Sequence, residues 1–222
     1  MNNFFPRDLH EYIINPIILV RHGQAESNVS NLIGGWSQTA LTDLGRHQAQ
    51  LVAARLKNEL EHVEVSFYCS DLKRAAQTAE IIAEKKGVKI IQEEGFREMN
   101  NGIADGKTRE EVEKYRVPPT RPVLNWREYP GAETWREFYI RVSECMENII
   151  QETDKPLLIV AHEKTIALVV AWWIRFPPDP SRSFTLQTYY TGITILFEIQ
   201  GVRAIERHND VAHLQHEGAR AR

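Results

Sequence analysis

The sequence predicts an α/β protein, a three-layer α/β/α sandwich with a mostly parallel central sheet. Short apolar runs alternate along the chain with longer segments whose apolar residues recur at helical spacing. No stretch rich in proline, glycine and serine divides the 222 residues, so we expect one domain over residues 1–222. Within it, residues 1–15 read as a short polar extension and residues 215–222 as a polar tail.

The expected strands are short apolar runs bounded by turn-forming residues. The first covers residues 17–20, directly after Pro16, and ends in a charged turn. Gln200-Gly201 predicts the turn of a hairpin near the C-terminus. The other predicted strands cover residues 67–69, 88–91, 157–160, 192–199 and 202–207.

The expected helices carry start and stop signals as well as apolar periodicity. Thr42 can cap a helix over residues 43–60, and Gly87 closes another over residues 72–86. Residues 22–40 and 118–130 are rich in turn formers or proline and are predicted to be irregular. The remaining predicted helices cover residues 109–115, 133–153 and 163–176.

Composition excludes several classes of protein. The net charge is −3, so no general positive field favours a nucleic-acid partner. Cys69 and Cys145 are too few and too far apart for a disulfide framework, which favours two buried thiols and a reducing, cytoplasmic location. The longest apolar run, residues 166–174, is far shorter than the roughly 20 residues that span a bilayer, so no membrane association is expected.

Two segments share one pattern, a buried strand that delivers a histidine at its carboxyl end. They are residues 17–22, ending in His22, and residues 157–162, ending in His162. Ligands of open α/β sheets bind outside the carboxyl ends of the strands, so the two histidines are expected to meet there. Gly23 follows His22 and would permit a sharp turn and a close ligand approach.

Two arginines accompany these histidines. Arg21 precedes His22, and Arg74 lies in the first turn of a helix that follows a third strand. A guanidinium fork suits phosphate oxygens, and a helix start offers unpaired N–H groups to an anion. Because the set lacks a carboxylate or third histidine at ligand spacing and brings cations, it favours anion binding over a metal site. No metal and no cofactor are expected.

These residues and their neighbours resemble the motifs of a known family, the histidine phosphatase superfamily, which has the phosphoglycerate mutase-like fold. The resemblance runs in order over about residues 16–214. The matching motifs are residues 21–28 (RHGQAESN), 35–36 (GW), 41–45 (LTDLG), 70–80 (SDLKRAAQTAE), 96–98 (FRE), 130–133 (PGAE) with Arg141, and 209–214 (NDVAHL). One such motif is weak evidence, whereas several in the family's order are strong evidence.

The resemblance implies a role for each matched residue. His22 would be the nucleophile that becomes phosphohistidine, and Glu98 the general acid that later activates water. A protonated His162 would bind the phosphoryl oxygens together with two arginines and an amide. The implied phosphate or substrate ligands are Arg21, Gly23, Asn28, Gly34, Gly35, Arg74, His162 and Glu163. Loop aromatics, Trp36, Trp126 and Tyr129, are candidates for the rim of the pocket.

Glu163 departs from the family pattern, which usually has a small residue, often glycine, after the second histidine. A carboxylate beside a bound dianion costs energy unless it points away or meets a cation. Two explanations stay open. Either only the backbone of Glu163 faces the pocket, which we favour, or the substrate carries a positive group there.

The favoured function is a phosphatase for a small phosphorylated metabolite. A cofactor-dependent phosphoglycerate mutase is the nearest alternative, but the interval from Glu98 to His162 is short for the lid that such mutases close over the substrate. A protein phosphatase or a signalling protein that binds phosphorylated ligands is the third alternative. The substrate's identity and a homodimeric state both stay open.

Overall fold

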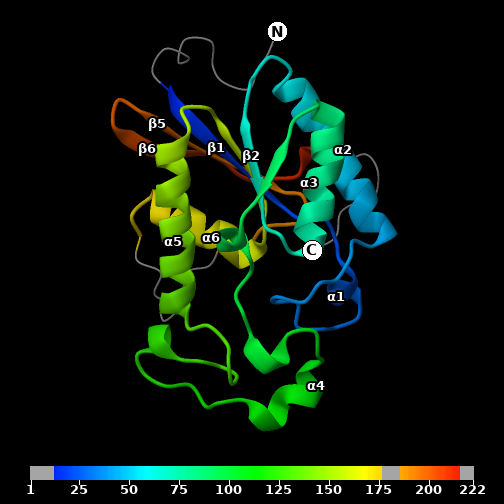
Figure 1. The fold of residues 1–222 in the computed structure, drawn as a ribbon, viewed down its shortest axis with the longest axis vertical. Coiled ribbons are helices and arrows are strands. Elements are labelled where there is room, and N and C mark those ends of the chain that lie inside the picture. The colour runs from blue at the N-terminus through cyan, green and yellow to red at the C-terminus, as the bar shows by residue number, and fades with distance from the viewer. Residues whose placement is uncertain (1–12, 177–185, 216–222) are drawn as a thin grey trace.

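The central sheet has six strands and lies between two layers of helices (Figure 1). The computed structural model describes residues 13–176 and 186–215. The strand order is β3-β2-β4-β1-β5-β6, with β5 antiparallel to both of its neighbours and β3, β2, β4 and β1 parallel. This confirms the predicted sandwich. The strands are β1 (Ile13–Arg21), β2 (Ser66–Cys69), β3 (Ile90–Gln92), β4 (Leu157–Ala161), β5 (Ile193–Ile199) and β6 (Val202–Asp210).

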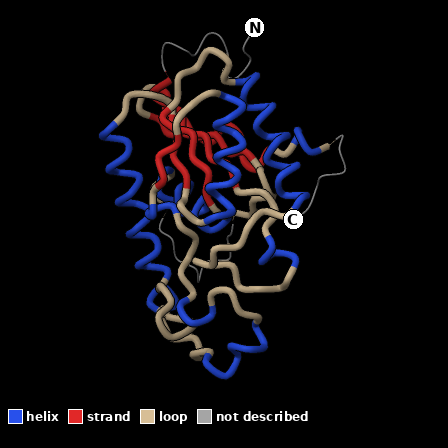
Figure 2. Tube along the Cα trace, turned by 45° about the vertical axis from the view of Figure 1, so that its right-hand side comes forward, coloured by secondary structure: helices blue, strands red, loops and turns tan. Residues whose placement is uncertain are grey.

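The helices cover the two faces of the sheet in pairs, with α2 and α3 on one face and α5 and α6 on the other (Figure 2). Thr42 caps α2 by accepting a hydrogen bond from the Gly45 N–H, and Gly87 ends α3 in the left-handed conformation, as predicted. The helices are α1 (Glu26–Val29), α2 (Asp43–Glu59), α3 (Lys73–Lys86), α4 (Arg109–Val112), α5 (Trp135–Glu152) and α6 (Glu163–Trp173).

Alternate residues of β1 supply the two halves of the core. Ile18 and Val20 pack towards α2 and α3, whereas Ile17 and Leu19 pack towards α5 and α6. Burial of each such side chain stabilises the fold by about 1.5–3 kcal/mol. Because β1 is covered on both faces, its carboxyl end is a fixed platform for the residues that follow it.

Several predicted bounds differ from the structure; among them, β3 begins at Ile90 rather than 88, and β6 runs to Asp210 rather than 207. β1 begins at Ile13, so residues 13–15 are not part of an extension. A register shift between Ile14 and Ile17 accommodates Pro16, which has no N–H for the ladder. The predicted loop 22–40 contains the one-turn helix α1. α6 ends at Trp173 rather than 176. Residues 1–12 and 216–222 of the predicted extension and tail lie outside the described residues.

Residues 100–133 form a lobe beyond the carboxyl ends of the strands, at the bottom of Figure 1. The lobe consists of short helical turns and irregular chain around a small core of its own. That core contains Ala104, Val112, Tyr129 and Ala132, with Ile33 packed against it. The lobe therefore stands over the edge of the sheet at which β1, β2 and β4 end.

Other expectations from composition concern thiols and membranes. Cys69 and Cys145 are buried and unpaired, as predicted. Among the described residues, no helix combines the length and apolarity that crossing a membrane requires.

Candidate active site

The carboxyl ends of β1, β4 and β2 bring the predicted histidines and arginines together. His22 follows β1 and His162 follows β4, and their ring centroids lie 5.1 Å apart. Arg74, from the first turn of α3 after β2, places its Nε 3.3 Å from Nε2 of His22. Arg21 is the last residue of β1 and is only 8% exposed. The structure therefore brings the two imidazoles and the two guanidiniums together at one edge of the sheet.

His22 is held in one tautomer. Its Nδ1 lies 2.7 Å from the carbonyl oxygen of Gly23, and because a carbonyl only accepts, Nδ1 carries the proton. Nε2 then keeps its lone pair and accepts from Arg74. Burial lowers the pKa of His22 well below 6.5, and the charges of Arg74 and Arg21 lower it further. The ring is therefore neutral at neutral pH, with a nucleophilic nitrogen towards the arginines.

Arg74 is a buried cation fixed by backbone carbonyls. Its Nη1 donates to the Ser37 carbonyl at 2.9 Å and its Nη2 to the Gly35 carbonyl at 2.7 Å. Burial lowers its pKa to about 10, so it stays charged at neutral pH. A guanidinium held in this way needs little reorganisation to face a developing negative charge.

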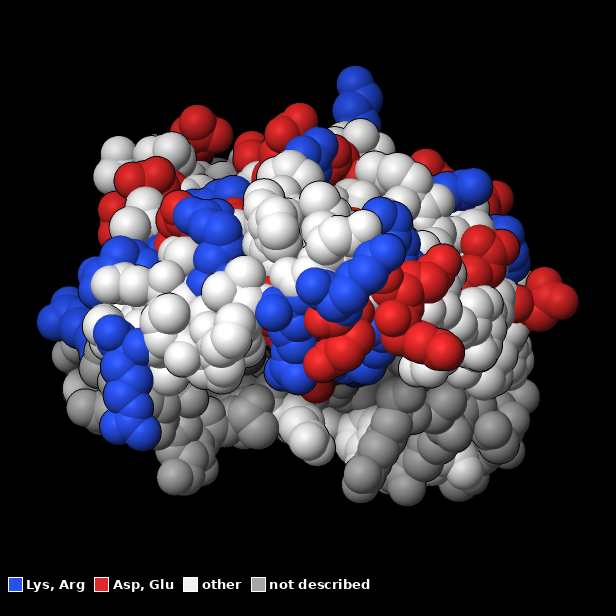
Figure 3. Space-filling model, turned by 90° about the horizontal axis from the view of Figure 1, so that it is seen from below, with Lys and Arg blue, Asp and Glu red and all other residues white. Residues whose placement is uncertain are grey.

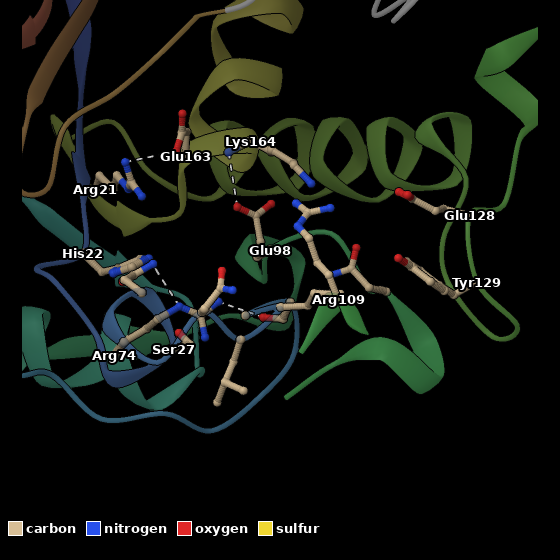
Figure 4. Close-up of a pocket in the computed structure, with 17 residues that line it drawn as sticks. Arg21, His22, Ser27, Arg74, Glu98, Arg109, Glu128, Tyr129, Glu163 and Lys164 are labelled. Carbon is tan, nitrogen blue, oxygen red and sulfur yellow. Dashed lines mark hydrogen bonds and ion pairs between the residues drawn. The ribbon is translucent and has the colours of Figure 1, made fainter. Parts of the chain in front are cut away.

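Arg21 lies on the side of the His22 ring away from Arg74 (Figure 4) and is held there by several contacts. Its Nη1 donates to the Thr188 carbonyl, and its Cζ lies 4.3 Å above the centroid of the Tyr190 ring. The same Nη1 forms an ion pair of 3.0 Å with Glu163. Its buried Nε has no hydrogen-bond partner among the described residues. Arg21 thus retains hydrogen-bonding capacity for an anion.

His162 lies beside His22 and is fully buried. Its Nε2 is 2.9 Å from the hydroxyl of Ser70, and its Nδ1 has no partner within the described part of the chain. Burial lowers its pKa well below 6.5, and Arg74, His22 and Arg21 lower it further. Without a bound anion the ring is neutral, and an incoming dianion would favour the protonated form.

A cavity of about 280 Å³ opens in front of His22 (Figure 4). Eight of the ten predicted site residues line it, whereas Gly23 and His162 do not. Figure 4 shows His22, Arg21 and Arg74 at one end of the cavity, Glu98 in the middle, and Arg109, Glu128 and Tyr129 at the other end. The lining residues are Arg21, His22, Ser27, Asn28, Asn31, Leu32, Ile33, Gly34, Gly35, Arg74, Glu98, Asn101, Arg109, Glu128, Tyr129, Glu163 and Lys164.

The three glycines predicted for the site, Gly23, Gly34 and Gly35, differ in how much their positions depend on the absence of a side chain. Gly23 is expected to admit a ligand, but it does not line the cavity. A Cβ there would lie 2.4 Å from the Gly45 carbonyl oxygen, so its small size permits the contact between the turn after β1 and the first turn of α2. Gly35 has φ +36°, and a Cβ there would collide with Asp105. Its conformation directs its carbonyl to Arg74. Gly34 lines the cavity without such a constraint.

Asn28 presents its amide group to the cavity. Its Oδ1 accepts the backbone N–H of Ala25 at 2.8 Å, across the first turn of α1. The carbonyl end of the side chain is therefore occupied, and the NH₂ end is available to an anion in the cavity. The role of Asn28 as a donor to an anion stays a prediction.

Glu98 is fixed by the chain around it. Its Oε1 accepts from the Met99 N–H at 2.8 Å and its Oε2 from the Lys164 N–H at 3.3 Å, at the start of α6. Its backbone carbonyl accepts from Nε1 of Trp36 at 2.7 Å and from Arg141 at 3.2 Å. Trp36 therefore supports the loop of Glu98 rather than the rim, and Tyr129 alone of the three predicted aromatics lines the cavity.

The expectation that only the backbone of Glu163 faces the cavity is wrong, because its side chain faces the cavity as well (Figure 4). It lines the cavity and forms the 3.0 Å ion pair with Arg21, so the protein itself supplies the cation that the carboxylate needs. Sequence spacing could not reveal this, because Arg21 and Glu163 follow different strands. Their contact depends on β1 and β4 being neighbours in the sheet.

Several residues of the site were missed in the sequence. Ser70 begins the matched motif 70–80 but was given no role there, and it contacts His162. Thr188 and Tyr190 support Arg21 and belong to no motif that the sequence analysis used. Arg109 was assigned only to a short helix. Lys164 could have been found, because it lies two residues after His162 on the same strand-to-helix turn.

The residues around His22 suit an anion better than a metal ion. Among the described residues, no group of three or more His, Cys, Asp or Glu could hold a metal. The nearest charged groups to His22 are guanidiniums, which would repel a cation. Seen from the end that carries the lobe, the described surface has acidic and basic side chains interspersed rather than a face of one sign (Figure 3).

Comparison with known proteins finds relatives named as phosphoglycerate mutases and others named as phosphatases. The chain is 35% identical over 179 residues to a protein of Photorhabdus laumondii named probable phosphoglycerate mutase GpmB, covering 77% of this chain and 80% of the relative. It is 31% identical over 183 residues to the 2,3-bisphosphoglycerate-dependent phosphoglycerate mutase of Cytophaga hutchinsonii, covering 78% of this chain and 83% of the relative.

Solved structures agree on the fold. Bacillus stearothermophilus YhfR matches with a TM-score of 0.76 and 27% identity, over 90% of this chain and 100% of its own. The phosphoserine phosphatase of Entamoeba histolytica, solved with 3-phosphoglyceric acid, matches with a TM-score of 0.73 and 26% identity, over 90% and 99%. The model of the histidine phosphatase superfamily (branch 1) matches residues 17–211. This chain belongs to that superfamily, whose members among its relatives bear the names of phosphatases and mutases.

Proposed function

We propose that the protein is a phosphomonoester hydrolase that acts on a small phosphorylated metabolite through a phosphohistidine on His22, without a metal. One observation carries the proposal. The neutral ring of His22 keeps Nδ1 bonded to Gly23 and turns the lone pair of Nε2 towards Arg74, inside a cavity lined by a second guanidinium, that of Arg21. A nucleophilic nitrogen between two fixed cations is what phosphoryl transfer to histidine requires.

In the first step, Nε2 of His22 attacks phosphorus and the bond from phosphorus to the ester oxygen breaks. Glu98 gives its proton to that oxygen, so the alcohol leaves neutral. The phosphoryl oxygens would be held by Arg21, Arg74 and the amide of Asn28. Two further donors would be Nε of Arg21 and, once His162 is protonated, Nδ1 of that ring, which lies beside His22 rather than in the lining of the cavity. Neither atom has a partner among the described residues.

In the second step, water attacks the phosphorus of phosphohistidine and the nitrogen–phosphorus bond breaks. The Glu98 carboxylate takes a proton from the water, and inorganic phosphate leaves with His22 neutral again. The same residue acts first as acid and then as base, which returns the site to its starting protonation state.

The size and composition of the cavity support a small substrate. Its volume of about 280 Å³ lies just below the usual range for pockets that bind small molecules, which begins at about 300 Å³. The lobe covers one side of it, which leaves less room for a folded phosphoprotein than an open groove would.

Release of phosphate from p-nitrophenyl phosphate in the presence of a chelator tests the proposal. We expect the wild type to be active and His22→Ala to lose more than about 10⁴-fold in kcat. Mass spectrometry after rapid acid-free quenching should place the phosphoryl group on the peptide that contains His22. Activity that needs an added metal, or a phosphoryl group on another residue, contradicts the proposal.

A phosphoglycerate mutase is the second candidate, favoured by the names of the relatives at 35% and 31% identity. It would use the same phosphohistidine but return the phosphoryl group to the sugar acid instead of to water. Incubation with 3-phosphoglycerate and a bisphosphate primer distinguishes the two. Formation of 2-phosphoglycerate faster than release of phosphate would establish the mutase.

A further inference from the structure

Arg141, from α5, contacts the loop that carries Glu98. Its Nη1 donates to the backbone carbonyls of Gly95 at 3.0 Å and Arg97 at 3.1 Å, and its Nη2 donates to that of Glu98 at 3.2 Å. A longer contact of 3.4 Å joins Nη1 to the Glu94 carbonyl. Carbonyls along this whole loop are therefore gathered around one guanidinium, which no step of the proposed mechanism uses.

The guanidinium of Arg141 is itself fixed by a carboxylate, that of Glu133. Nε of Arg141 lies 2.8 Å from Oε1 of Glu133, and Nη2 lies 2.8 Å from Oε2, so two parallel hydrogen bonds set the plane of the fork. The two side chains are only 20% and 15% exposed, which limits screening by water. Glu133 also exchanges hydrogen bonds with the backbone of Asn100, at the start of the lobe.

Glu98 is thus held at both its backbone and its side chain. Its carbonyl accepts from Arg141 on one side and from Nε1 of Trp36, at 2.7 Å, on the other. Its carboxylate, which lines the cavity, accepts the N–H groups of Met99 and Lys164. With the backbone fixed in this way, the carboxylate has a defined place relative to His22.

We propose that Arg141 is a positioning residue, which holds Glu98 where its carboxyl group can protonate the leaving oxygen. This inference rests on the proposed function, in which Glu98 is the general acid. Arg141 does not line the cavity, so it would act through the backbone of Glu98 rather than on the substrate. A displacement of about 1 Å at a reacting group can slow a reaction by about 10²-fold, so the support of this loop matters for the rate.

Two substrates of similar shape test this role. Phenyl phosphate has a poorer leaving group than p-nitrophenyl phosphate, because phenol is a weaker acid than p-nitrophenol, and it depends more on a proton donor. In Arg141→Gln we expect kcat for phenyl phosphate to fall by about 10- to 100-fold and kcat for p-nitrophenyl phosphate by less than about threefold. Equal losses on the two substrates would overturn the proposal, since a general disturbance of the fold does not distinguish leaving groups.

Arg136→Gln is the matched control, because Arg136 is an exposed arginine of the same helix and its Nε donates to Asn125. The control should keep the wild-type rates on both substrates. A double variant shows whether Arg141 acts through Glu98. Once Glu98→Gln has removed the acid, adding Arg141→Gln should slow phenyl phosphate hydrolysis by less than about threefold more. Losses that multiply in full would mean that Arg141 acts by another route and would overturn the proposal.

The charge of Arg141 must be separated from its geometry. Burial chiefly lowers the pKa of His162, and the charges of Arg74, His22, Arg21 and Arg141 lower it further. Arg141→Lys keeps the charge but loses the planar fork, so it should show the same selective loss on phenyl phosphate as Arg141→Gln. Full recovery of the rate in Arg141→Lys would assign the effect to charge and would overturn the proposal.

Glu133→Gln provides a second variant that leaves Arg141 in place. It weakens the ion pair that orients the fork, so kcat for phenyl phosphate should fall by about 3- to 10-fold while kcat for p-nitrophenyl phosphate stays the same. An unchanged ratio of the two rates would count against the proposal. This variant still decides the question if the variants of Arg141 do not fold.

Hydrogen exchange separates this inference from the proposed function, because it needs no turnover. The indole N–H of Trp36, identified by its loss in Trp36→Phe, reports whether the Glu98 carbonyl stays in place. Its exchange should be at least about tenfold faster in Arg141→Gln than in the wild type. If the wild type hydrolyses both substrates but neither the ratio of rates nor this exchange changes in Arg141→Gln, the phosphatase stands and the positioning role is wrong. If neither substrate is hydrolysed but the exchange is faster, Arg141 holds Glu98 and the phosphatase is wrong.

Discussion

The two ends of the cavity are built by different means. At the inner end, Arg21, His22 and Arg74 lie at or just beyond the carboxyl ends of buried strands. They are nearly inaccessible to solvent, and each contacts a backbone carbonyl. At the outer end, Arg109 is exposed on a lobe whose own core contains few residues. The inner end therefore has the preorganised charge that the proposed chemistry requires, whereas the outer end is more exposed and less constrained.

The largest expected effect is on kcat/KM, when an arginine of each end is replaced by glutamine. Arg74→Gln should lower kcat/KM for p-nitrophenyl phosphate by about 10²–10³-fold, because it removes a fixed charge from the transferring phosphoryl group. Arg109→Gln should lower it by less than about tenfold, because Arg109 is exposed and lies at the other end of the cavity from His22. Steady-state kinetics on variants with wild-type circular dichroism make the comparison. Losses of equal size would remove the distinction between the two ends.

Glu98 lies between the two ends of the cavity, and the effect of replacing it on the rate should depend on the leaving group of the substrate. Glu98→Gln should slow hydrolysis of an alkyl phosphate by about 10²–10⁴-fold, because an alkoxide leaves only when it is protonated. The loss with p-nitrophenyl phosphate should be far smaller, since nitrophenolate needs no proton to leave. Glu94→Gln is the control, because that carboxylate is 73% exposed beside the same loop. Equal losses on both substrates would exclude Glu98 as the acid.

The same contrast explains what the sequence could predict. The inner end follows strand-to-turn transitions that buried apolar runs reveal, so Arg21, His22, Arg74 and His162 were found and do converge. Arg109 belongs to a segment of short turns whose position relative to the sheet depends on tertiary contacts. One such contact is the bridge between Asn101 and Ala132, and no periodicity encodes it. The boundaries that failed, such as the start of β1, depended on pairing with a strand distant in the chain.

The buried histidines of the inner end should make stability depend on pH. The pKa of His22 and that of His162 are lowered well below 6.5 in the folded protein, chiefly by burial. As the pH falls below 6.5, the unfolded chain binds protons that the folded chain does not, so the free energy of unfolding decreases. Each histidine contributes up to about 1.4 kcal/mol per pH unit. The contribution is fully present above pH 6.5 and is lost on acidification.

Urea unfolding in phosphate-free buffer on both sides of pH 6.5 measures this dependence. His162→Gln removes one titrating group, so the slope of stability against pH below 6.5 should fall by up to about 1.4 kcal/mol per pH unit. An unchanged slope in the variant would mean that His162 is already protonated in the folded protein.

Replacing Glu163 should have the smallest of these effects. Its carboxylate places a negative charge at the inner end of the cavity, beside Arg21. In Glu163→Gln the repulsion between this carboxylate and a bound dianion is removed, while Arg21 keeps the Thr188 carbonyl and the Tyr190 ring. We therefore expect the inhibition constant of inorganic phosphate to fall by about 3- to 10-fold at low ionic strength, with a smaller change in high salt. Glu110→Gln, an exposed carboxylate outside the cavity, should leave the constant unchanged. If phosphate instead binds more weakly to Glu163→Gln, the ion pair positions Arg21 for the phosphoryl group. The inner end would then depend on a carboxylate at the position where the resemblance leads us to expect a small residue.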